Sequence, residues 1–253
     1  MQLLELAAYL DGFLAHQQFR DIALNGLQVD GGAPVERIAL AVDSSLGAIE
    51  QAVAGGAQLL LVHHGLFWGA LEPVTGMHGR RLRTALKADL SIYASHLPLD
   101  AHPEVGNNAE LARLLGAEIR APLGEFKGAK VGFAAELAEP LGLELLRGKI
   151  ARALKLSLAE VRVFGAAERP IKRLGIVSGG ASSNLQEAID AGCDAFLTGE
   201  PHYSAFYVAV EQGVPLICAG HYHTETLGVR ALGAHLGQRF GLSSFFIDLP
   251  TGI

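Results

Sequence analysis

The chain has 253 residues, a formal net charge of −6 and a hydrophobic content of 50%. Mean hydropathy is +0.29, yet the apolar runs are far shorter than the ~20 residues that a helix needs to cross a membrane. The acidic, scattered charges argue against a surface for duplex nucleic acid. No basic segment followed by an apolar one opens the chain, so we expect a soluble cytoplasmic protein that binds neither membranes nor nucleic acid.

Apolar segments alternate along the chain with segments of helical periodicity. The predicted strands span residues 37–42, 58–62, 90–95, 130–136, 160–164, 173–177, 194–198, 214–219 and 244–248. The predicted helices span residues 1–16, 45–55, 78–88, 107–116, 140–155, 182–191, 203–212 and 225–239. Strands separated by helices of this length are typical of βαβ units. The sequence therefore predicts an α/β fold with mostly parallel sheets, whose buried strands account for the high apolar content.

Two stretches of the chain share one pattern. The segment that begins at Glu36 aligns without a gap with the segment that begins at Lys172, as far as His64 and Glu200. Further on, residues 91–96 resemble residues 216–221, which sets His96 against His221. This similarity predicts an internal duplication. We expect a first α/β lobe in residues 1–116 and a second in residues 169–253. Residues 117–168 are expected to form a connecting strand–helix–strand segment within one compact unit.

Histidines and carboxylates follow the predicted strands. Ligands bind beyond the carboxyl ends of the strands in open parallel sheets, so these positions are candidates for a site. They are His63, His64, His96, Asp100, Glu200, His202, His221, His223 and Glu225. Three further histidines lie outside these segments and receive no role: His16, His78 and His235.

The pair His63–His64 ends an apolar strand and precedes Gly65. Neighbouring side chains of a regular strand point to opposite faces, but a chain that turns at the glycine lets both rings converge. Imidazoles and carboxylates without cysteine suit Zn, Mn, Fe, Co or Ni. Five ligands are predicted: His63, His64, Asp100, His221 and Glu225. Because five exceed the needs of one tetrahedral ion, we expect two divalent ions ~3.5–4 Å apart.

Each ligand also has a plainer interpretation. Asp100 follows Pro98 and could be a turn residue, and Glu225 could favour a helix N-terminus. Three other histidines are better interpreted as residues that line a pocket or orient ligands: His102, His202 and His223. The shared placement of the five at strand ends nevertheless favours a common metal site.

Several other motifs have ordinary explanations. The glycine-rich turn at residues 178–184 could hold an anion but lacks a phosphate-binding spacing, so a tight turn is preferred. Asn107 or Asn108 is predicted to cap a helix. Ser44 and Ser95 lack the context of a nucleophile, which argues against a serine hydrolase. The two cysteines, Cys193 and Cys218, are expected in the core of a protein from a reducing compartment.

Taken together, "NGLQV", "VHHGLFW", "SHLPLDAHPEVGNNAELARLLG", "TGE" and "AGHYHTE" resemble the Nif-three-like (YbgI-like) dinuclear metal-centre family. Its members are often labelled GTP cyclohydrolase I type II homologues. The resemblance implies a duplicated α/β fold with a metal site between the lobes, and a toroidal homohexamer with metal pairs facing an internal cavity. It also implies metal ligands at His63, His64, Asp100, His221 and Glu225, while Tyr222 stands where a second histidine is common.

A paired-metal centre suits hydrolysis, because it activates water and clamps an electrophile. We therefore expect a metal-dependent hydrolase that acts on a nucleotide or related small molecule. Glu200 and His96 are the predicted catalytic residues, for proton transfer or for orienting the ligands. The alternative is a non-catalytic, metal-binding hexameric assembly for metal storage, metal delivery or protein interaction, because fold alone does not settle function.

Overall fold

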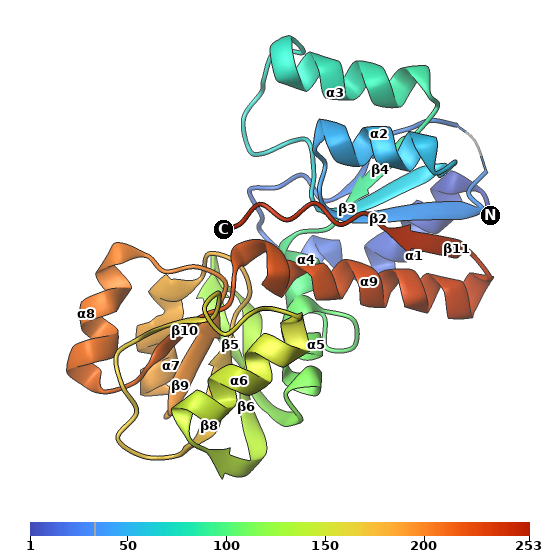
Figure 1. Ribbon diagram of the computed structural model, residues 1–253. Helices are drawn as coiled ribbons and strands as arrows, with labels where there is room; N and C mark the ends of the chain where they lie inside the picture. The colour runs from blue at the N-terminus through green and yellow to red at the C-terminus, as the bar shows by residue number, and fades with distance from the viewer. Residues whose placement is uncertain (33) are drawn as a thin grey trace. The chain divides into compact units, whose positions relative to one another are not determined.

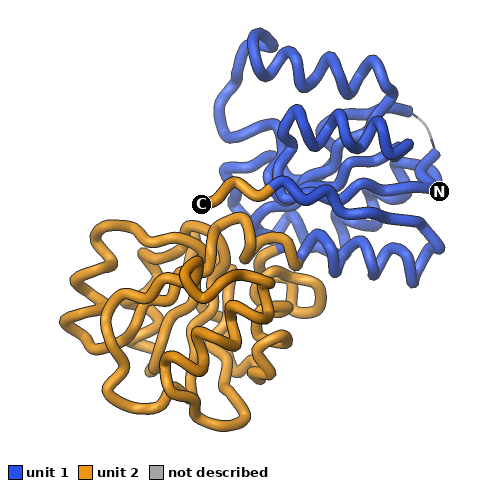
Figure 2. The backbone as a smooth tube through the Cα atoms, viewed as in Figure 1, with its two compact units in different colours: residues 1–99, 228–249 blue, residues 100–227, 250–253 orange. Residues whose placement is uncertain are grey.

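The computed structural model describes residues 1–32 and 34–253, which form two compact units (Figure 2). The first unit comprises residues 1–99 and 228–249, and the second comprises residues 100–227 and 250–253. These bounds differ from the predicted lobes, because the first unit leaves residues 100–116 to the second. The segment 117–168 is part of the second unit, where it contributes three strands to the sheet, and the chain returns to the first unit after Leu227.

A five-stranded sheet forms the centre of the first unit. In sheet order its strands are β1 (Gly26–Val29), β4 (Ser91–Ala94), β3 (Leu59–His64), β2 (Arg37–Asp43) and β11 (Ser243–Phe246). β1 is antiparallel to β4, and all other neighbours are parallel. The predicted mostly parallel sheet is confirmed here.

Helices cover both faces of this sheet (Figure 1). They are α1 (Leu3–Phe13), α2 (Leu46–Ala54), α3 (Gly76–Lys87) and the part of α9 (His221–Phe240) that follows Leu227; the short helix η1 (His16–Gln18) follows α1. α2 and α3 lie on one face, where Ile49 and Ala85 pack with Leu60 and Val62. α1 and α9 lie on the other face, where a Cβ at Gly233 would collide with the side chain of Leu40. A glycine in α9 therefore permits close packing of this helix on β2.

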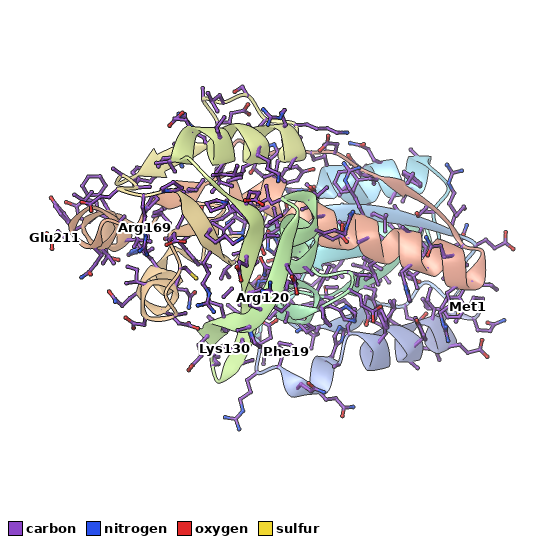
Figure 3. The ribbon with its side chains drawn as sticks, turned by 90° about the horizontal axis from the view of Figure 1, so that it is seen from below. Met1, Phe19, Arg120, Lys130, Arg169 and Glu211 are labelled. Atoms are coloured by element: carbon purple, nitrogen blue, oxygen red, sulfur yellow. The ribbon has the colours of Figure 1, made fainter. Side chains whose placement is uncertain are left out.

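A six-stranded mixed sheet forms the centre of the second unit. In sheet order its strands are β5 (Ala117–Phe126), β6 (Ala129–Leu141), β8 (Ile171–Ile176), β9 (Ala195–Thr198), β10 (Leu216–Cys218) and β7 (Arg162–Phe164). The neighbours β8, β9 and β10 are parallel, and the other pairs are antiparallel. The parallel arrangement in this unit is thus limited to the three strands of the predicted repeat. The hairpin of β5 and β6 carries Arg120 and Lys130 (Figure 3).

Helices also cover both faces of the second sheet. They are α4 (Leu97–Ala101, at the boundary between the units), α5 (Asn107–Leu114), α6 (Leu143–Leu154), η2 (Ser182–Asn184), α7 (Leu185–Asp190) and α8 (Tyr203–Gln212). Leu111 of α5 and Leu146 of α6 pack with Leu174 and Leu197 in one buried cluster. Gly175 faces the opposite way, where an added Cβ would lie 3.0 Å from Ala188 of α7.

The strand register confirms the duplication. Ile38 pairs with Leu59, and Leu174 pairs with Ala195, so both partners recur 136 positions later (174 − 38 and 195 − 59). The third strand corrects one detail of the sequence alignment. Val62 pairs with Ala94, and its counterpart Thr198 pairs with Cys218, one residue before the position that the alignment assigned.

By this register His96 corresponds to Gly220 rather than to His221. Both backbones continue the same pattern: Ser95 N–H donates to Val62 O, and Ala219 N–H donates to Thr198 O. The two histidines are therefore independent features of the two lobes. Within the described part of the chain, no helix has the length and apolar character that spanning a lipid bilayer demands.

Candidate metal centre

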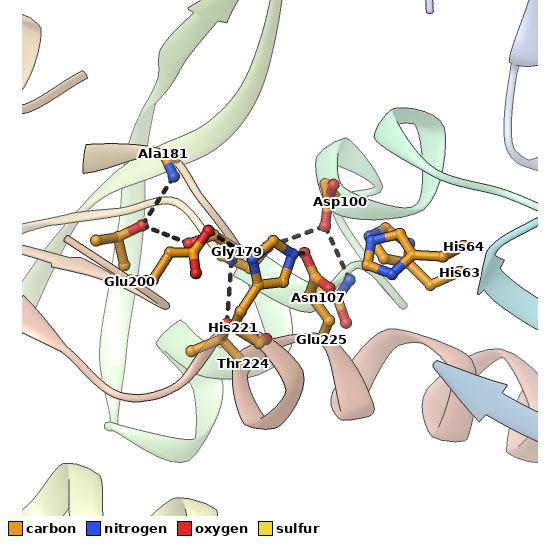
Figure 4. Close-up of polar contacts among 12 residues, drawn as sticks. His63, His64, Asp100, Asn107, Gly179, Ala181, Glu200, His221, Thr224 and Glu225 are labelled. Carbon is orange, nitrogen blue, oxygen red and sulfur yellow. Dashed lines mark hydrogen bonds and ion pairs between the residues drawn. The ribbon is translucent and has the colours of Figure 1, made fainter. Parts of the chain in front are cut away.

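Two imidazole rings lie side by side at the end of β3. The strand continues through His63 and His64, two residues beyond its predicted end, and their ring centroids are 4.7 Å apart (Figure 4). Gly65 follows, and a Cβ at that position would collide with the side chain of Gln28. The glycine therefore permits close approach of Gln28 directly after the pair, whereas its φ does not lie in the left-handed region.

Each of these rings is held through its Nδ1 atom. His63 Nδ1 donates to the carbonyl oxygen of Ser95 at 2.9 Å, and His64 Nδ1 lies 2.8 Å from Asp43 Oδ1. Asp43 is the cross-strand neighbour of His64 in the β2–β3 ladder, which explains this contact. Because a carbonyl or carboxylate oxygen can only accept, each proton is on Nδ1, and Nε2 carries the lone pair that a metal ion requires.

His96 joins this pair. Its ring centroid lies 5.1 Å from that of His63 and 5.6 Å from that of His64. One ring nitrogen from each of the three histidines lies within 4.8 Å of the other two, which is a grouping that could hold a metal ion. The backbone N–H of His96 donates to Asn25 Oδ1 at 2.7 Å, which fixes the start of this segment.

A buried carboxylate supports His96. Asp21 has a side chain only 2% exposed, and its Oδ1 lies 3.0 Å from His96 Nδ1. Burial opposes the ionisation of Asp21. Hydrogen bonds from His96, Asn25 and the backbone of Ala23, with the charge of His96, outweigh that effect and hold the pKa of Asp21 well below its ordinary value. Sequence reasoning missed Asp21, because it lies in an irregular segment far from His96 in the chain.

A second polar group lies at the start of α9 in the second unit. His221 Nδ1 is 3.1 Å from Glu200 Oε1, and His221 Nε2 is 3.1 Å from Glu225 Oε1 (Figure 4). Burial alone would lower the pKa of His221. The hydrogen bonds and charges of Glu225 and Glu200 outweigh burial and raise this pKa to about 9. A spacing of i, i+4 on one helix places His221 and Glu225 on the same face.

Glycines in the turn after β8 make room for these carboxylates. A Cβ at Gly179, whose φ is +65°, would collide with Glu225 Oε1, and a Cβ at Gly180 would lie 3.0 Å from Glu200 Oε1. The N–H of Gly179 donates to Thr224 Oγ1 at 3.1 Å. The glycine-rich turn therefore serves close approach of protein carboxylates, which agrees with its prediction as a tight turn.

Asp100 lies in α4 and is 6% exposed. Its Oδ1 accepts hydrogen bonds from Asn107 Nδ2 at 2.8 Å and from Ser178 Oγ at 2.9 Å (Figure 4). Asn108 donates to the carbonyl oxygens of Asp100 and Val131, and its Oδ1 accepts from the N–H of Ser178. The prediction that Asn107 or Asn108 caps a helix is wrong, because Gly106 is the N-cap and the two amides hold the segment around Asp100.

The predicted site residues thus form two groups, one in each unit. The first contains His63, His64 and His96, and the second contains Asp100, Glu200, His221 and Glu225. His102 instead accepts backbone N–H groups of its own turn, and His202 contacts Ser204. His223 borders a cavity in the second unit.

Ser95 has a side-chain contact that sequence reasoning missed. Its hydroxyl lies 3.0 Å from His16 Nε2, and His16 Nδ1 lies 3.2 Å from Asp11 Oδ1. The hydroxyl of Tyr93 donates to the same Asp11 oxygen at 2.7 Å. The sequence carried no signal for this group, because Asp11 and His16 precede the first strand and show no spacing relative to Ser95.

Comparison with known proteins gives a consistent result. A family model described as Duf34/NIF3 (NGG1p interacting factor 3) matches residues 1–251. A protein of Deinococcus radiodurans named "GTP cyclohydrolase 1 type 2 homolog" is 45% identical over 249 residues, which are 98% of this chain and 94% of the relative. A protein of Archaeoglobus fulgidus with the same name is 42% identical over the full length of both chains. A solved structure titled "protein ybgI, unknown function" is 36% identical and superposes over both full chains with a TM-score of 0.93.

Proposed function

Because the chain belongs to the Duf34/NIF3 family, we propose that it is a metal-dependent hydrolase that acts on a nucleotide or a related small molecule. The proposed centre holds two divalent ions from the set Zn, Mn, Fe, Co and Ni. The proposed ligands are His63, His64, Asp100, His221 and Glu225. The nucleotide part of the proposal draws support from the name of the curated relatives, "GTP cyclohydrolase 1 type 2 homolog".

One observation carries the metal part of the proposal. The Nδ1 atoms of His63, His64 and His221 each contact an oxygen acceptor: the Ser95 carbonyl, Asp43 and Glu200. Histidines that bind metal ions characteristically donate their other ring N–H to a carbonyl or carboxylate, which fixes the tautomer. The donor set of imidazole nitrogens and carboxylate oxygens, without sulfur, fits borderline divalent ions.

Bound divalent ions would supply Lewis acidity, which activates water and polarises the electrophile. The residues of the chain prepare this chemistry. Asn107 and Ser178 fix the carboxylate of Asp100, and Glu200 fixes the ring of His221. We propose Glu200 as a positioning residue and His96 as the group that moves a proton, at Nε2, because Asp21 holds its Nδ1 atom.

The resemblance also implies a toroidal homohexamer, the composition indicates the cytoplasm, and both belong to the proposal. A mass measurement of the purified protein in solution tests the assembly. A hexamer mass supports it, and a stable monomer contradicts it.

Metal analysis followed by a substrate panel tests the function. Purified protein is expected to contain about two divalent ions per chain and, with that metal, to hydrolyse members of a panel of nucleotides and phosphoesters. Asp100→Asn and Glu225→Gln should abolish turnover without changing the assembly. Glu211→Gln, an exposed carboxylate of α8, is the matched control and should retain activity. Full metal occupancy without any turnover would contradict the hydrolase and favour a metal-binding assembly.

A further inference from the structure

An aromatic cavity lies in the second unit. Its volume is about 470 Å³, which falls within the ~300–1,000 Å³ of small-molecule pockets. We use the name aromatic cavity for the space lined by Arg162, Phe164, Tyr203, Phe206, Tyr207 and Leu216. None of these six residues is a proposed metal ligand or supports one.

Strand alternation explains one wall of the aromatic cavity. β7 pairs antiparallel with β10, with Phe164 opposite Leu216 and Arg162 opposite Cys218. Val163 faces the other way and packs against the buried cluster of the unit. Because side chains alternate along a strand, Arg162 and Phe164 share the face that bears the cavity.

Helix α8 forms the other wall. Tyr203, Phe206 and Tyr207 stand at positions i, i+3 and i+4, which share one face of a helix. Tyr203 is 83% exposed and Tyr207 is 54% exposed. Phe206 meets Phe164 and Tyr207 edge to face, with centroid distances of 6.2 and 5.2 Å. Edge-to-face pairs leave ring faces uncovered, so a flat ring entering the cavity can stack on them.

A cation stands at the edge of this aromatic surface. Arg162 is exposed and takes part in no ion pair within the described ranges 1–32 and 34–253. It also borders a second cavity of about 440 Å³, together with Glu160 and His223. A guanidinium group binds a phosphate through two parallel hydrogen bonds, which selects an anion of that shape.

We propose that the aromatic cavity binds a planar aromatic ring that carries a phosphate group, such as a purine nucleoside monophosphate. Because the rings of Phe206 and Tyr207 are perpendicular, the bound ring stacks on one of them and meets the other at its edge, and the phosphate contacts Arg162. Proteins that bind single-stranded nucleic acid hold its bases by stacking them on aromatic side chains, with a contribution from arginine, and the aromatic cavity offers both kinds of group.

The cavity adjoins the segment that carries Glu200. Pro201 and His202 directly follow Glu200 and also line the cavity. The N–H of His202 donates to the buried hydroxyl of Ser182 at 2.6 Å, which anchors this segment. The binding proposal goes beyond the proposed hydrolase, because it needs neither bound metal nor turnover.

Calorimetric titration of the whole protein tests the proposal. The probes are AMP and GMP, the nucleosides adenosine and guanosine, and inorganic phosphate, each with metal-loaded and chelator-treated protein. Phe206→Ala and Tyr207→Ala should each weaken nucleotide and nucleoside binding roughly tenfold, because each removes an aromatic contact to the bound ring. Arg162→Gln should weaken nucleotide binding by a similar factor and leave nucleoside binding unchanged.

Arg169→Gln is the matched control. Arg169 pairs with Asp194 and lies near Glu211 on the same unit, beside a different cavity (Figure 3). It should leave all affinities unchanged. Absence of binding to both nucleotides, binding that the three cavity variants do not change, or binding lost on chelation would overturn the proposal. A change in the mass of the assembly in Phe206→Ala or Tyr207→Ala would also overturn the proposal, because it would show that the aromatic cavity lies in a subunit interface. Failure of the hydrolase proposal leaves these affinities unaffected.

Discussion

The Nε2 atom of His16 lies 3.0 Å from the hydroxyl oxygen of Ser95, whose carbonyl oxygen accepts a hydrogen bond from His63. Asp11 contacts the other nitrogen of His16, so the order is that of a serine–histidine–aspartate group. Ser95, however, is fully buried, and a substrate cannot reach its hydroxyl. The group therefore supports the strand end that orients His63, and the absence of a serine-nucleophile context in the sequence agrees with this role.

We predict that His16 acts on the metal centre through Ser95. His16→Ala and Ser95→Ala should each weaken divalent-metal binding about tenfold, the lower end of the effect of groups that orient metal ligands. The double variant should bind metal no more weakly than either single variant, because both substitutions remove the same His16–Ser95 interaction. Metal competition with a chromophoric chelator measures this. His235→Ala, in the same unit but in contact with Tyr9, is the control. Additive losses would show that the two residues act separately.

The raised pKa of His221 predicts a pH dependence of stability in the metal-free protein. The folded pKa of about 9 lies above the ordinary histidine value of 6.5, so this stabilising contribution is complete below pH 6.5 and is lost as the pH rises to 9. Thermal unfolding in chelator should therefore show a Tm that falls between pH 6.5 and 9. Glu225→Gln should flatten this fall, because it removes the chief charge that raises the pKa. An equally steep fall in the variant would contradict the assignment.

Gly179→Ala should weaken the second polar group. A Cβ would collide with Glu225 Oε1 and displace the carboxylate, so metal affinity should fall at least tenfold. Gly213→Ala provides a close control, because Gly213 has the same φ of +65° and nothing lies within 4 Å of the added Cβ. Both substitutions strain the backbone by about 1–2 kcal/mol, and only the first should change metal affinity. Equal metal affinities of Gly179→Ala and Gly213→Ala would show that the collision with Glu225 does not affect metal binding.

The buried carboxylate of Asp21 should stabilise the first unit. Asp21→Asn replaces an acceptor of several hydrogen bonds, including the N–H of Leu97, and should cost about 1–3 kcal/mol in denaturant unfolding at pH 7. Because the folded pKa of Asp21 lies below the ordinary aspartate value of 3.8, the greater stability of the wild type is present above that pH and is lost as the pH falls further. A difference that persists unchanged at pH 2 would argue against an ionised Asp21.

The sequence predicted what depends on local pattern. All nine predicted strands are present, because alternating apolar runs and helices are local signals. β1 and β5 escaped prediction. Both are edge strands, and β5 is interrupted by Pro122, so its pairing is set by the partner strand β6. α9 begins at His221, four residues before its predicted start, so that His221 and Glu225 share one helix face.

Contacts between distant segments could not be predicted in the same way. Asp43 lies one residue beyond the predicted strand 37–42, and its contact with His64 was not predicted, because the pairing follows from strand register. Asp21 reaches His96 across 75 positions of the chain. No periodic pattern reports such a contact. The sequence therefore indicated the proposed metal ligands, whereas the residues that contact and orient the histidines were identified only in the structure.

The duplicated strand tips show how two copies of one backbone can diverge in chemistry. Asp43 and His64 of the first copy correspond to Gly179 and Glu200 of the second. In the first copy, Asp43 of β2 contacts the imidazole of His64 on the neighbouring strand β3. In the second copy, the absence of a side chain at Gly179 makes room for Glu225, and Glu200 contacts the imidazole of His221 in α9. The same backbone pattern thus carries the supporting carboxylate at the end of β2 in the first copy and just after β9 in the second.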